Sequence, residues 1–183
     1  MRVITGLARG RKLREPEGMD IRPTTDMVKE SIFNIIQYDI EGRNALDLFA
    51  GTGQLGIEAL SRGAASVTFV DESASAIRLV KENLKLTGLP GGKTVHGDAL
   101  SFLERPGKFD LIFIDPPYET DLINKSLQKI FEFDKLNENG IIVCESRVEM
   151  EMPELPHPYN KYREYRYGRV KVTLYIKSSR FSE

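Results

Sequence analysis

A strand, a glycine-rich turn and a helix follow one another directly within residues 45–60, and this unit constrains the fold more than any other part of the chain. Ala45–Phe49 is a short, mostly apolar run typical of a buried strand, and Leu55–Leu60 has the apolar spacing of a helix. The turn between them has the pattern G-x-G-x-x-G, formed by Gly51, Gly53 and Gly56. Such a turn brings backbone N–H groups and a helix N-terminus close to a ligand. The first interpretation is therefore an α/β fold that binds NAD or FAD here.

Strand and helix patterns alternate from residue 44 to residue 144. The predicted strands span residues 44–49, 66–71, 93–96, 109–114 and 140–144. The predicted helices span residues 26–38, 55–62, 74–87, 98–103 and 121–131. The strands are apolar at nearly every residue, which is typical of a parallel sheet covered by helices on both faces.

The two ends of the chain depart from this alternation. Residues 2–14 are predicted to form a basic hairpin, and residues 162–176 a terminal antiparallel hairpin. The predicted fold is a three-layer α/β/α, Rossmann-like fold with a mostly parallel sheet, an antiparallel C-terminal hairpin and a basic N-terminal hairpin extension. The chain has 183 residues, enough for one domain. We expect residues 1–183 to form that domain, with residues 1–20 as the extension and residues 22–183 as the ligand-binding core.

Composition restricts the cellular compartment and the kinds of ligand site that we expect for this protein. The one cysteine, Cys144, lies in an apolar run and is predicted to be a packed core residue. No apolar run approaches the about 20 residues that span a bilayer, and the N-terminus lacks the apolar segment of a signal peptide. These features predict a cytoplasmic protein with no membrane partner. Two histidines and one cysteine make no ligand cluster, so no metal is expected.

Positive charge gathers in two segments, although the net charge is only −1. The N-terminal segment carries Arg2, Arg9, Arg11, Lys12 and Arg14 with no acid among them. The C-terminal cluster combines five cations with four tyrosines: Lys161, Arg163, Arg166, Arg169, Lys171, Tyr159, Tyr162, Tyr165 and Tyr167. Cations and aromatic rings suit a polyanion with bases that stack. The alternative for each cluster is a solvated hairpin, with the tyrosines packed along one side.

Acidic residues follow the predicted strands at the edge where ligands of parallel sheets bind. Asp71 lies 20 residues after Gly51, the spacing expected for a carboxylate that binds the two ribose hydroxyls. Asp98 and Asp115 end the next two strands. A single acid of this kind would be a helix cap or a solvated loop residue. Three of them beside the glycine turn predict a site for an adenosine-like nucleoside.

Two observations favour S-adenosylmethionine (SAM) over NAD, which remains the alternative at this point. The second half of the sheet is too short for a full second mononucleotide unit. Asp47 lies near the end of the first strand, where a carboxylate would be unfavourable beside a pyrophosphate but favourable beside an ammonium or sulfonium cation. The glycines would then allow close backbone approach without binding an anion.

The segment Asp115-Pro116-Pro117-Tyr118 decides between these ligands. Two prolines directly after a buried strand fix a stiff, extended turn with few backbone donors. The Asp115 carboxylate and the Pro116 carbonyl become two acceptors, and Tyr118 adds an aromatic face. Together they suit a planar base with an exocyclic amino group, whose nitrogen lone pair they would direct at an electrophilic methyl group.

These motifs resemble those of a known family. Asp47-Leu-Phe-Ala-Gly-Thr-Gly with Asp115-Pro-Pro-Tyr is similar to the amino-group branch of the class I SAM-dependent methyltransferases. The closer resemblance is to the bacterial small-subunit rRNA guanine-N2 methyltransferases of the RsmD type. It extends over residues 2–147, through Arg2-Val-Ile-Thr-Gly, Arg9-Gly-Arg-Lys-Leu, Arg22-Pro-Thr-Thr-Asp, Leu55-Gly-Ile-Glu-Ala-Leu-Ser-Arg and Val143-Cys-Glu-Ser. Residues 148–183 show only a general basic hairpin.

The resemblance implies a role for each matching residue. The residues it assigns to the cofactor SAM are Asp47, Phe49, Gly51, Thr52, Gly53, Asp71, Asp98 and Ala99. Asp71 would bind the ribose and Asp98 the adenine amino group. Asp115, Pro116 and Tyr118 would hold the guanine as catalytic residues. The residues expected to meet RNA are Arg2, Arg9, Arg11, Lys12, Arg22 and Thr25.

The implied activity is direct, in-line methyl transfer to the N2 amino group of one guanine in 16S rRNA, with S-adenosyl-L-homocysteine (SAH) as the other product. Asp115 either accepts the proton lost from the amino group or only orients that group. The expected partner is 16S rRNA within an assembling small subunit, and the expected state is a monomer. The alternatives are a DNA or RNA adenine-N6 methyltransferase, an NAD-dependent oxidoreductase, and an rRNA-binding assembly factor without catalysis.

Overall fold

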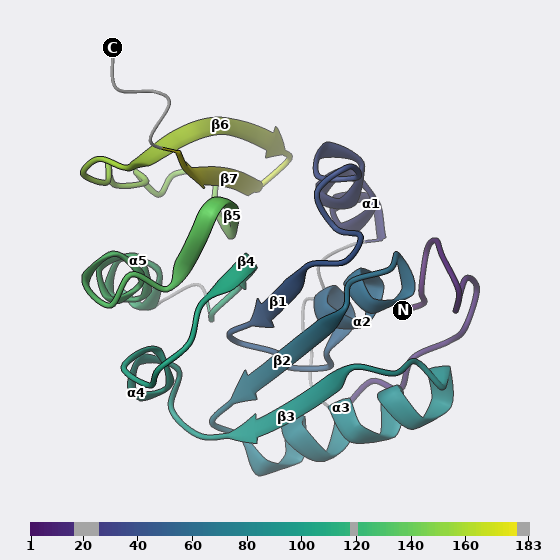
Figure 1. Cartoon of the computed structure of the whole chain (residues 1–183). Helices are drawn as coiled ribbons and strands as arrows, with labels where there is room; N and C mark the ends of the chain where they lie inside the picture. Colours follow the sequence, from purple (N-terminus) through teal and green to yellow (C-terminus); the bar gives the residue numbers. More distant parts are fainter. Residues whose placement is uncertain (17–25, 118–120, 179–183) are drawn as a thin grey trace.

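The computed structural model describes residues 1–16, 26–117 and 121–178, and within these ranges one sheet has the strand order β3-β2-β1-β4-β5-β7-β6 (Figure 1). Strands β1 to β5 run parallel to one another, whereas β7 is antiparallel to both β5 and β6. The strands are β1 (Asn44–Asp47), β2 (Ser66–Asp71), β3 (Gly92–His96), β4 (Phe109–Ile114), β5 (Leu136–Arg147), β6 (Tyr159–Tyr167) and β7 (Val170–Lys177).

Helices cover both faces of this sheet. They are α1 (Asp26–Ile35), α2 (Gln54–Ser61), α3 (Ala74–Thr87), α4 (Ala99–Leu103) and α5 (Leu122–Glu132). Apolar residues of α1, α2 and α3 form one buried cluster with the sheet, and those of α4 and α5 form a second. The predicted three-layer α/β/α arrangement with a mostly parallel sheet is confirmed.

Strand β4 illustrates why the central strands are apolar throughout. Leu111 and Phe113 belong to the cluster on the α1–α3 side, whereas Ile112 and Ile114 belong to the cluster on the α4–α5 side. Successive side chains of a strand point to opposite faces, so a strand covered on both sides needs apolar residues at every position.

The observed elements differ from the predicted ones mainly at the ends. Helix α1 stops at Ile35, three residues early, and Ile36 is buried in the turn that follows. Strand β5 is longer than the predicted 140–144 at both ends: it begins at Leu136, which pairs with β4, and its polar end pairs with β7 as far as Arg147. Glu145 and Ser146 are buried in that pairing, so their polarity concealed the continuation of the strand.

The predicted basic hairpin at the N-terminus is present and packs beside α2 and α3 (Figure 1). The backbone N–H of Val3 donates to the carbonyl of Arg11 at 3.0 Å, and that of Gly10 donates to the carbonyl of Val3 at 2.9 Å. Val3, Ala8 and Leu13 are buried in the same apolar cluster as the sheet. We call residues 1–14 the N-terminal hairpin below.

Strand order reverses next to β1, which has β2 on one side and β4 on the other. The connections from β1 to β2 and from β3 to β4 therefore leave the sheet in opposite directions. In such sheets a crevice forms beyond the carboxyl ends of the strands at this point. No helix in the described part of the chain is long and apolar enough to cross a membrane.

Candidate active site

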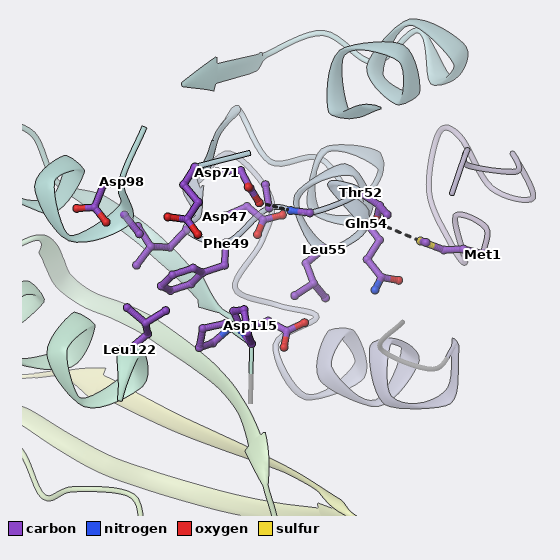
Figure 2. A pocket seen from close by; sticks show the side chains of 17 residues that line it. Met1, Asp47, Phe49, Thr52, Gln54, Leu55, Asp71, Asp98, Asp115 and Leu122 are labelled. Carbon is purple, nitrogen blue, oxygen red and sulfur yellow. Dashed lines mark hydrogen bonds between the residues drawn. The ribbon is translucent and has the colours of Figure 1, made fainter. Parts of the chain in front are cut away.

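A pocket of about 490 Å³ lies at that crevice, beyond the carboxyl ends of β1, β2 and β4 (Figure 2). Its size is within the range of small-molecule sites. Nine of the predicted site residues line it: Asp47, Phe49, Gly51, Thr52, Asp71, Asp98, Ala99, Asp115 and Pro116. Gly53 is not among the lining residues, and Tyr118 lies outside the described ranges.

The side chain of Asp47, the last residue of β1, lies at the N-terminus of helix α2. Its Oδ2 accepts a hydrogen bond from the backbone N–H of Gly56 at 3.0 Å, and the residue is only 2% exposed. The N-cap of α2, Gly53, has no side chain to perform this task. Burial, with a smaller effect from the nearby Asp71, raises the pKa of Asp47 to about 7 against the opposing effect of the Gly56 hydrogen bond. The anion position at this helix N-terminus is thus filled by the protein itself.

The glycines of the turn are each needed for a different physical reason. Gly51 and Gly53 have φ angles of 54° and 78°, in the left-handed region that favours glycine. A Cβ atom added to Gly51 would meet nothing within 4 Å, so its outer side is open. A Cβ on Gly56 would lie 2.3 Å from the ring of Phe69, so Gly56 permits close packing of α2 on β2.

Asp71 holds the glycine turn while it faces the pocket. One carboxylate oxygen accepts from the backbone N–H of Gly51 at 2.9 Å, and the other accepts from that of Ser73 at 2.8 Å. Each carboxylate oxygen has a further lone pair for a ligand hydroxyl group. The structure thus places Asp71 where the spacing from Gly51 predicted it.

Asp98 combines both roles considered for strand-end acids. Its Oδ1 accepts from the backbone N–H of Ser101 at 2.7 Å, which makes it the N-cap of α4. The backbone and side-chain hydrogen bonds from Ser101 lower the pKa of Asp98, so the carboxylate is ionised. Asp98 also lines the pocket, at the end opposite Met1 (Figure 2).

Asp115 and Pro116 form a second wall, because β4 pairs directly with β1. Asp47 is in register with Phe113, so the segment after Ile114 leaves the sheet beside the glycine turn. Figure 2 shows Asp115 below Asp47 and Leu55. The predicted acceptor turn and the predicted nucleoside-binding edge therefore share one pocket.

The pocket is strongly acidic. Its acidic residues are Asp47, Asp71, Glu72, Asp98 and Asp115, and no lysine or arginine lines it among the described residues. This charge favours a cationic ligand and opposes a pyrophosphate. Among the described residues, no cluster of three or more histidine, cysteine or acidic side chains has the geometry to hold a metal ion.

Comparison with known proteins assigns this chain to a family. Residues 1–176 match the family described as "Conserved hypothetical protein 95". A protein named ribosomal RNA small subunit methyltransferase D, from Escherichia coli K12, is 35% identical over 176 residues, which are 96% of this chain and 89% of that protein. The chain belongs to the RsmD family.

Two further relatives of the RsmD-family chain match over nearly their whole length. YlbH of Bacillus subtilis strain 168 is 44% identical over 182 residues, which are 97% of this chain and 99% of that protein. The solved structure of yhhF from Escherichia coli has a TM-score of 0.88 at 34% identity, covering 98% of both chains. The fold is that of the class I methyltransferases.

The RsmD-family chain exposes the cations predicted to meet RNA. Arg2, Arg9, Arg11 and Lys12 are all exposed on the N-terminal hairpin, and Arg2 lies 3.7 Å from the carboxylate of Asp26. The other two predicted RNA-binding residues, Arg22 and Thr25, lie outside the described ranges.

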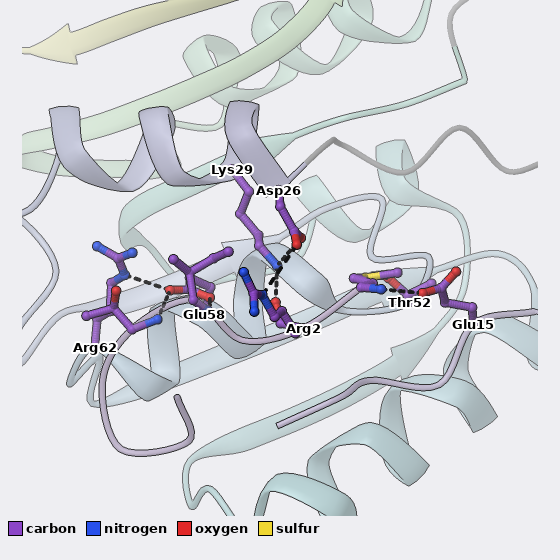
Figure 3. Close-up of polar contacts among 10 residues, drawn as sticks. Arg2, Glu15, Asp26, Lys29, Thr52, Glu58 and Arg62 are labelled. Carbon is purple, nitrogen blue, oxygen red and sulfur yellow. Dashed lines mark hydrogen bonds and ion pairs between the residues drawn. The ribbon is translucent and has the colours of Figure 1, made fainter. Parts of the chain in front are cut away.

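Buried polar side chains that the sequence did not reveal fix this hairpin to the core (Figure 3). Glu58 of α2 is fully buried and accepts from the backbone N–H groups of Ile4 at 2.8 Å and Thr5 at 3.0 Å. It also pairs with Arg62 at 2.8 Å. Lys29 of α1 is equally buried and donates to the carbonyl of Arg2. These buried contacts hold the N-terminal hairpin against the core.

Met1 is the residue through which the N-terminal hairpin reaches the pocket. Its side chain lines the site, and its sulfur accepts a hydrogen bond from the Thr52 hydroxyl at 3.4 Å. Met1 was not predicted as a site residue, because nothing in a sequence places a chain end beside a distant turn. Gln54, Leu55, Glu72 and Leu122 also line the pocket without having been predicted.

The C-terminal cluster divides between core and surface. Tyr159 and Lys171 are buried, whereas Tyr162, Arg163, Arg166 and Arg169 are exposed. The Arg163 guanidinium lies 5.0 Å from the centre of the Tyr162 ring.

Cys144, predicted to be a core residue, is fully buried in β5, and burial raises the pKa of its thiol far above the ordinary range.

Proposed function

We propose that this protein is a SAM-dependent methyltransferase that acts on the N2 amino group of a guanine in 16S rRNA. The observation that carries the cofactor assignment is the Asp47 carboxylate at the N-terminus of α2, 3.0 Å from the Gly56 nitrogen. A dinucleotide would place its pyrophosphate at such a helix end. The carboxylate already there repels a pyrophosphate and attracts a sulfonium or ammonium cation.

The lining residues fit SAM along its length. Asp98 and Ala99 at one end suit the adenine, with the Asp98 carboxylate accepting from the adenine amino group. Asp71, in the middle, suits the ribose hydroxyls. The open outer side of Gly51 and the neighbouring Thr52 leave room for the methionine part. When bound there, SAM supplies an electrophilic methyl group, and SAH remains after transfer.

Asp115 and Pro116 would hold the base that receives the methyl group. The carboxylate and the carbonyl each accept one hydrogen of the exocyclic amino group, which leaves the nitrogen lone pair directed at the methyl carbon. The N–C bond forms as the C–S bond breaks, and the amino group then loses one proton to Asp115 or to water. Tyr118 is proposed to stack on the guanine ring. Positioning of this kind is one source of the rate enhancement expected.

The small-subunit rRNA target rests on the similarity to the Escherichia coli protein named for it and on the exposed cations of the N-terminal hairpin. The proposed substrate is an assembling subunit, in which an unpaired guanine leaves its stack at a cost of a few kcal/mol. This substrate places the enzyme in the cytoplasm. We propose that residues 1–183 act as a monomeric, single-domain enzyme without a metal ion.

Nucleoside analysis tests the proposal. Small subunits from a strain that lacks this protein are incubated with the purified enzyme and isotopically labelled SAM, and their rRNA is digested to nucleosides. We expect label in N2-methylguanosine. Label in N6-methyladenosine would support the adenine methyltransferase instead, and binding of NADH but not SAM in calorimetry would support an oxidoreductase.

Replacing Asp115 separates chemistry from cofactor binding. The Asp115→Ala variant is expected to lose methyl transfer almost completely while its SAM affinity stays within a few-fold of the wild-type value. The matched control is Asp121→Ala, at an exposed acid near the start of α5. Wild-type turnover by Asp115→Ala would remove Asp115 from the proposed catalytic role.

A further inference from the structure

Gln54, the first residue of α2, has a buried acceptor that nothing in the described part of the protein satisfies. The residue is only 8% exposed, and its Oε1 has no hydrogen-bond partner within the described ranges. The other buried side-chain atom of this kind among the described residues is the hydroxyl of Ser126 in α5. Leaving a buried acceptor without a hydrogen bond destabilises the folded state, so a native protein retains one only for a reason.

Gln54 lines the same pocket as the nucleoside-binding acids. Figure 2 shows the order of these residues across the site: Asp98 at one end, then Asp71 and Asp47, then Thr52 and Gln54, with Met1 at the other end. The unsatisfied amide is thus at the end of the pocket farthest from Asp98.

This order fixes which part of the cofactor meets Gln54. With the adenine at Asp98 and the ribose at Asp71, the amino-acid part of SAM extends past Thr52 toward Gln54 and Met1. That part carries an α-ammonium group, which only donates, and an α-carboxylate, which only accepts. An amide oxygen in an acidic pocket complements the donor.

We propose that Gln54 Oε1 accepts a hydrogen bond from the α-ammonium group of bound SAM and so selects ligands that carry the amino-acid part. This inference rests on the proposed function, because it assigns a residue to one end of the same cofactor. Gln54 is then a binding residue, and it takes no part in methyl transfer itself.

The Gln54→Leu variant tests this contact because it removes the amide and keeps a side chain of similar bulk. Removing an unsatisfied buried acceptor does not leave a new one behind, so the ligand-free variant should be at least as stable as the wild type in thermal unfolding. The matched control is Ser126→Ala, which removes the other unsatisfied buried group among the described residues, a hydroxyl on α5.

Calorimetric titration of three ligands shows which part of the cofactor Gln54 contacts. SAH has the whole amino-acid part, decarboxylated SAH keeps only its amine, and 5′-methylthioadenosine has neither group. We expect Gln54→Leu to weaken SAH and decarboxylated SAH each about 10-fold, and to change the affinity for 5′-methylthioadenosine less than twofold. Ser126→Ala should leave all three affinities unchanged.

Other patterns overturn the proposal. Equal losses for all three ligands would mean that the substitution disturbs the nucleoside site. A loss for SAH but not for its decarboxylated form would assign the amide to the carboxylate. Unchanged affinities would exclude the contact. Failure of the wild-type protein to bind SAH at all would instead contradict the proposed function, so the two failures are distinguishable.

Discussion

The side-chain amide of Asn83 donates a hydrogen bond to the backbone carbonyl of Thr52, 3.0 Å away, and both atoms are buried. The same side chain accepts from the backbone N–H of Arg14 at 2.7 Å and donates to its carbonyl at 3.1 Å. One residue of α3 therefore joins the end of the N-terminal hairpin to the glycine turn. A segment proposed to bind RNA and a turn proposed to bind SAM have a common support.

Removing that support should affect both parts. Asn83 is fully buried, so Asn83→Ala leaves the Arg14 N–H and two carbonyl groups without their partner. We expect a loss of about 3 kcal/mol in the free energy of unfolding and a weaker affinity for SAM, measured by urea denaturation and calorimetry. Asn124→Ala, which removes an exposed hydrogen bond to Asp121, should change neither quantity measurably. Wild-type stability in Asn83→Ala would show that these contacts do not support the turn.

Asp47 should make stability depend on pH. Its pKa in the folded protein is about 7, above the ordinary value of 3.8, so the folded state binds one more proton than the unfolded state between these pH values. The free energy of unfolding should therefore fall as pH rises from 4 to 7, by up to about 1.4 kcal/mol per pH unit from this group. Asp47→Asn can still accept from Gly56 and should lack this decline. Urea denaturation of both proteins at pH 5 and pH 8 measures the difference. Parallel pH profiles would contradict the assignment.

The same carboxylate should distinguish SAM from SAH. A sulfonium cation favours ionised Asp47, whereas the neutral thioether of SAH does not. The ratio of the SAM affinity to the SAH affinity should rise as pH increases towards about 7, a range in which the α-ammonium group of each ligand is still mostly protonated. Calorimetric titrations at several pH values measure this ratio, and it should be flat in Asp47→Asn. A flat ratio in the wild type would place the sulfonium away from Asp47.

The sequence was sufficient to predict the order of strands and helices, because the features that define these elements are local. The apolar runs, the Ser73 cap and the Gly88 terminus of α3 all act within a few residues. Asp71 was predictable because strand ends of a parallel sheet share one edge. The role of Asp98 as both cap and lining residue follows from the same rule.

The polar anchors were not predictable in this way. Asn83 follows Val80 on the buried stripe of α3, a signal that a polar side chain has partners in the interior but not which ones. Glu58 is buried because the N-terminal hairpin covers the outer side of α2, and all eight residues of that helix are buried. The contacts of Asn83 and Glu58 with the N-terminal hairpin join residues more than fifty positions apart and depend on tertiary packing.

Breaking the buried Glu58–Arg62 pair should cost far more stability than breaking an exposed pair of similar length. Glu58→Gln leaves the nearly buried Arg62 guanidinium without its counter-ion and weakens two hydrogen bonds to the N-terminal hairpin. We expect a loss of about 3 kcal/mol in the free energy of unfolding. Glu82→Gln, which breaks the exposed pair with Arg14, should cost less than about 1 kcal/mol. Equal losses in the two variants would mean that burial does not distinguish these pairs.

The exposed cations of the N-terminal hairpin should determine how RNA affinity depends on salt. Each cation that neutralises a phosphate releases counterions, so its removal flattens the logarithmic slope of affinity against salt by about 0.7–0.9. The triple variant Arg9→Ala, Arg11→Ala and Lys12→Ala should raise the KM for RNA and reduce this slope by about 2, while the affinity for SAM stays unchanged. All three side chains are exposed, so stability should not fall.

A matched triple variant controls for total charge. Lys85, Lys93 and Lys125 are exposed cations on α3, β3 and α5, outside the N-terminal hairpin. Their replacement by alanine should reduce the slope by less than half as much, because charge far from the bound phosphates is screened beyond a Debye length of about 8 Å. Equal slopes in the hairpin variant and the wild type would remove the N-terminal hairpin from the RNA interface. Equal reductions in both triple variants would mean that RNA responds to net charge and not to a defined surface.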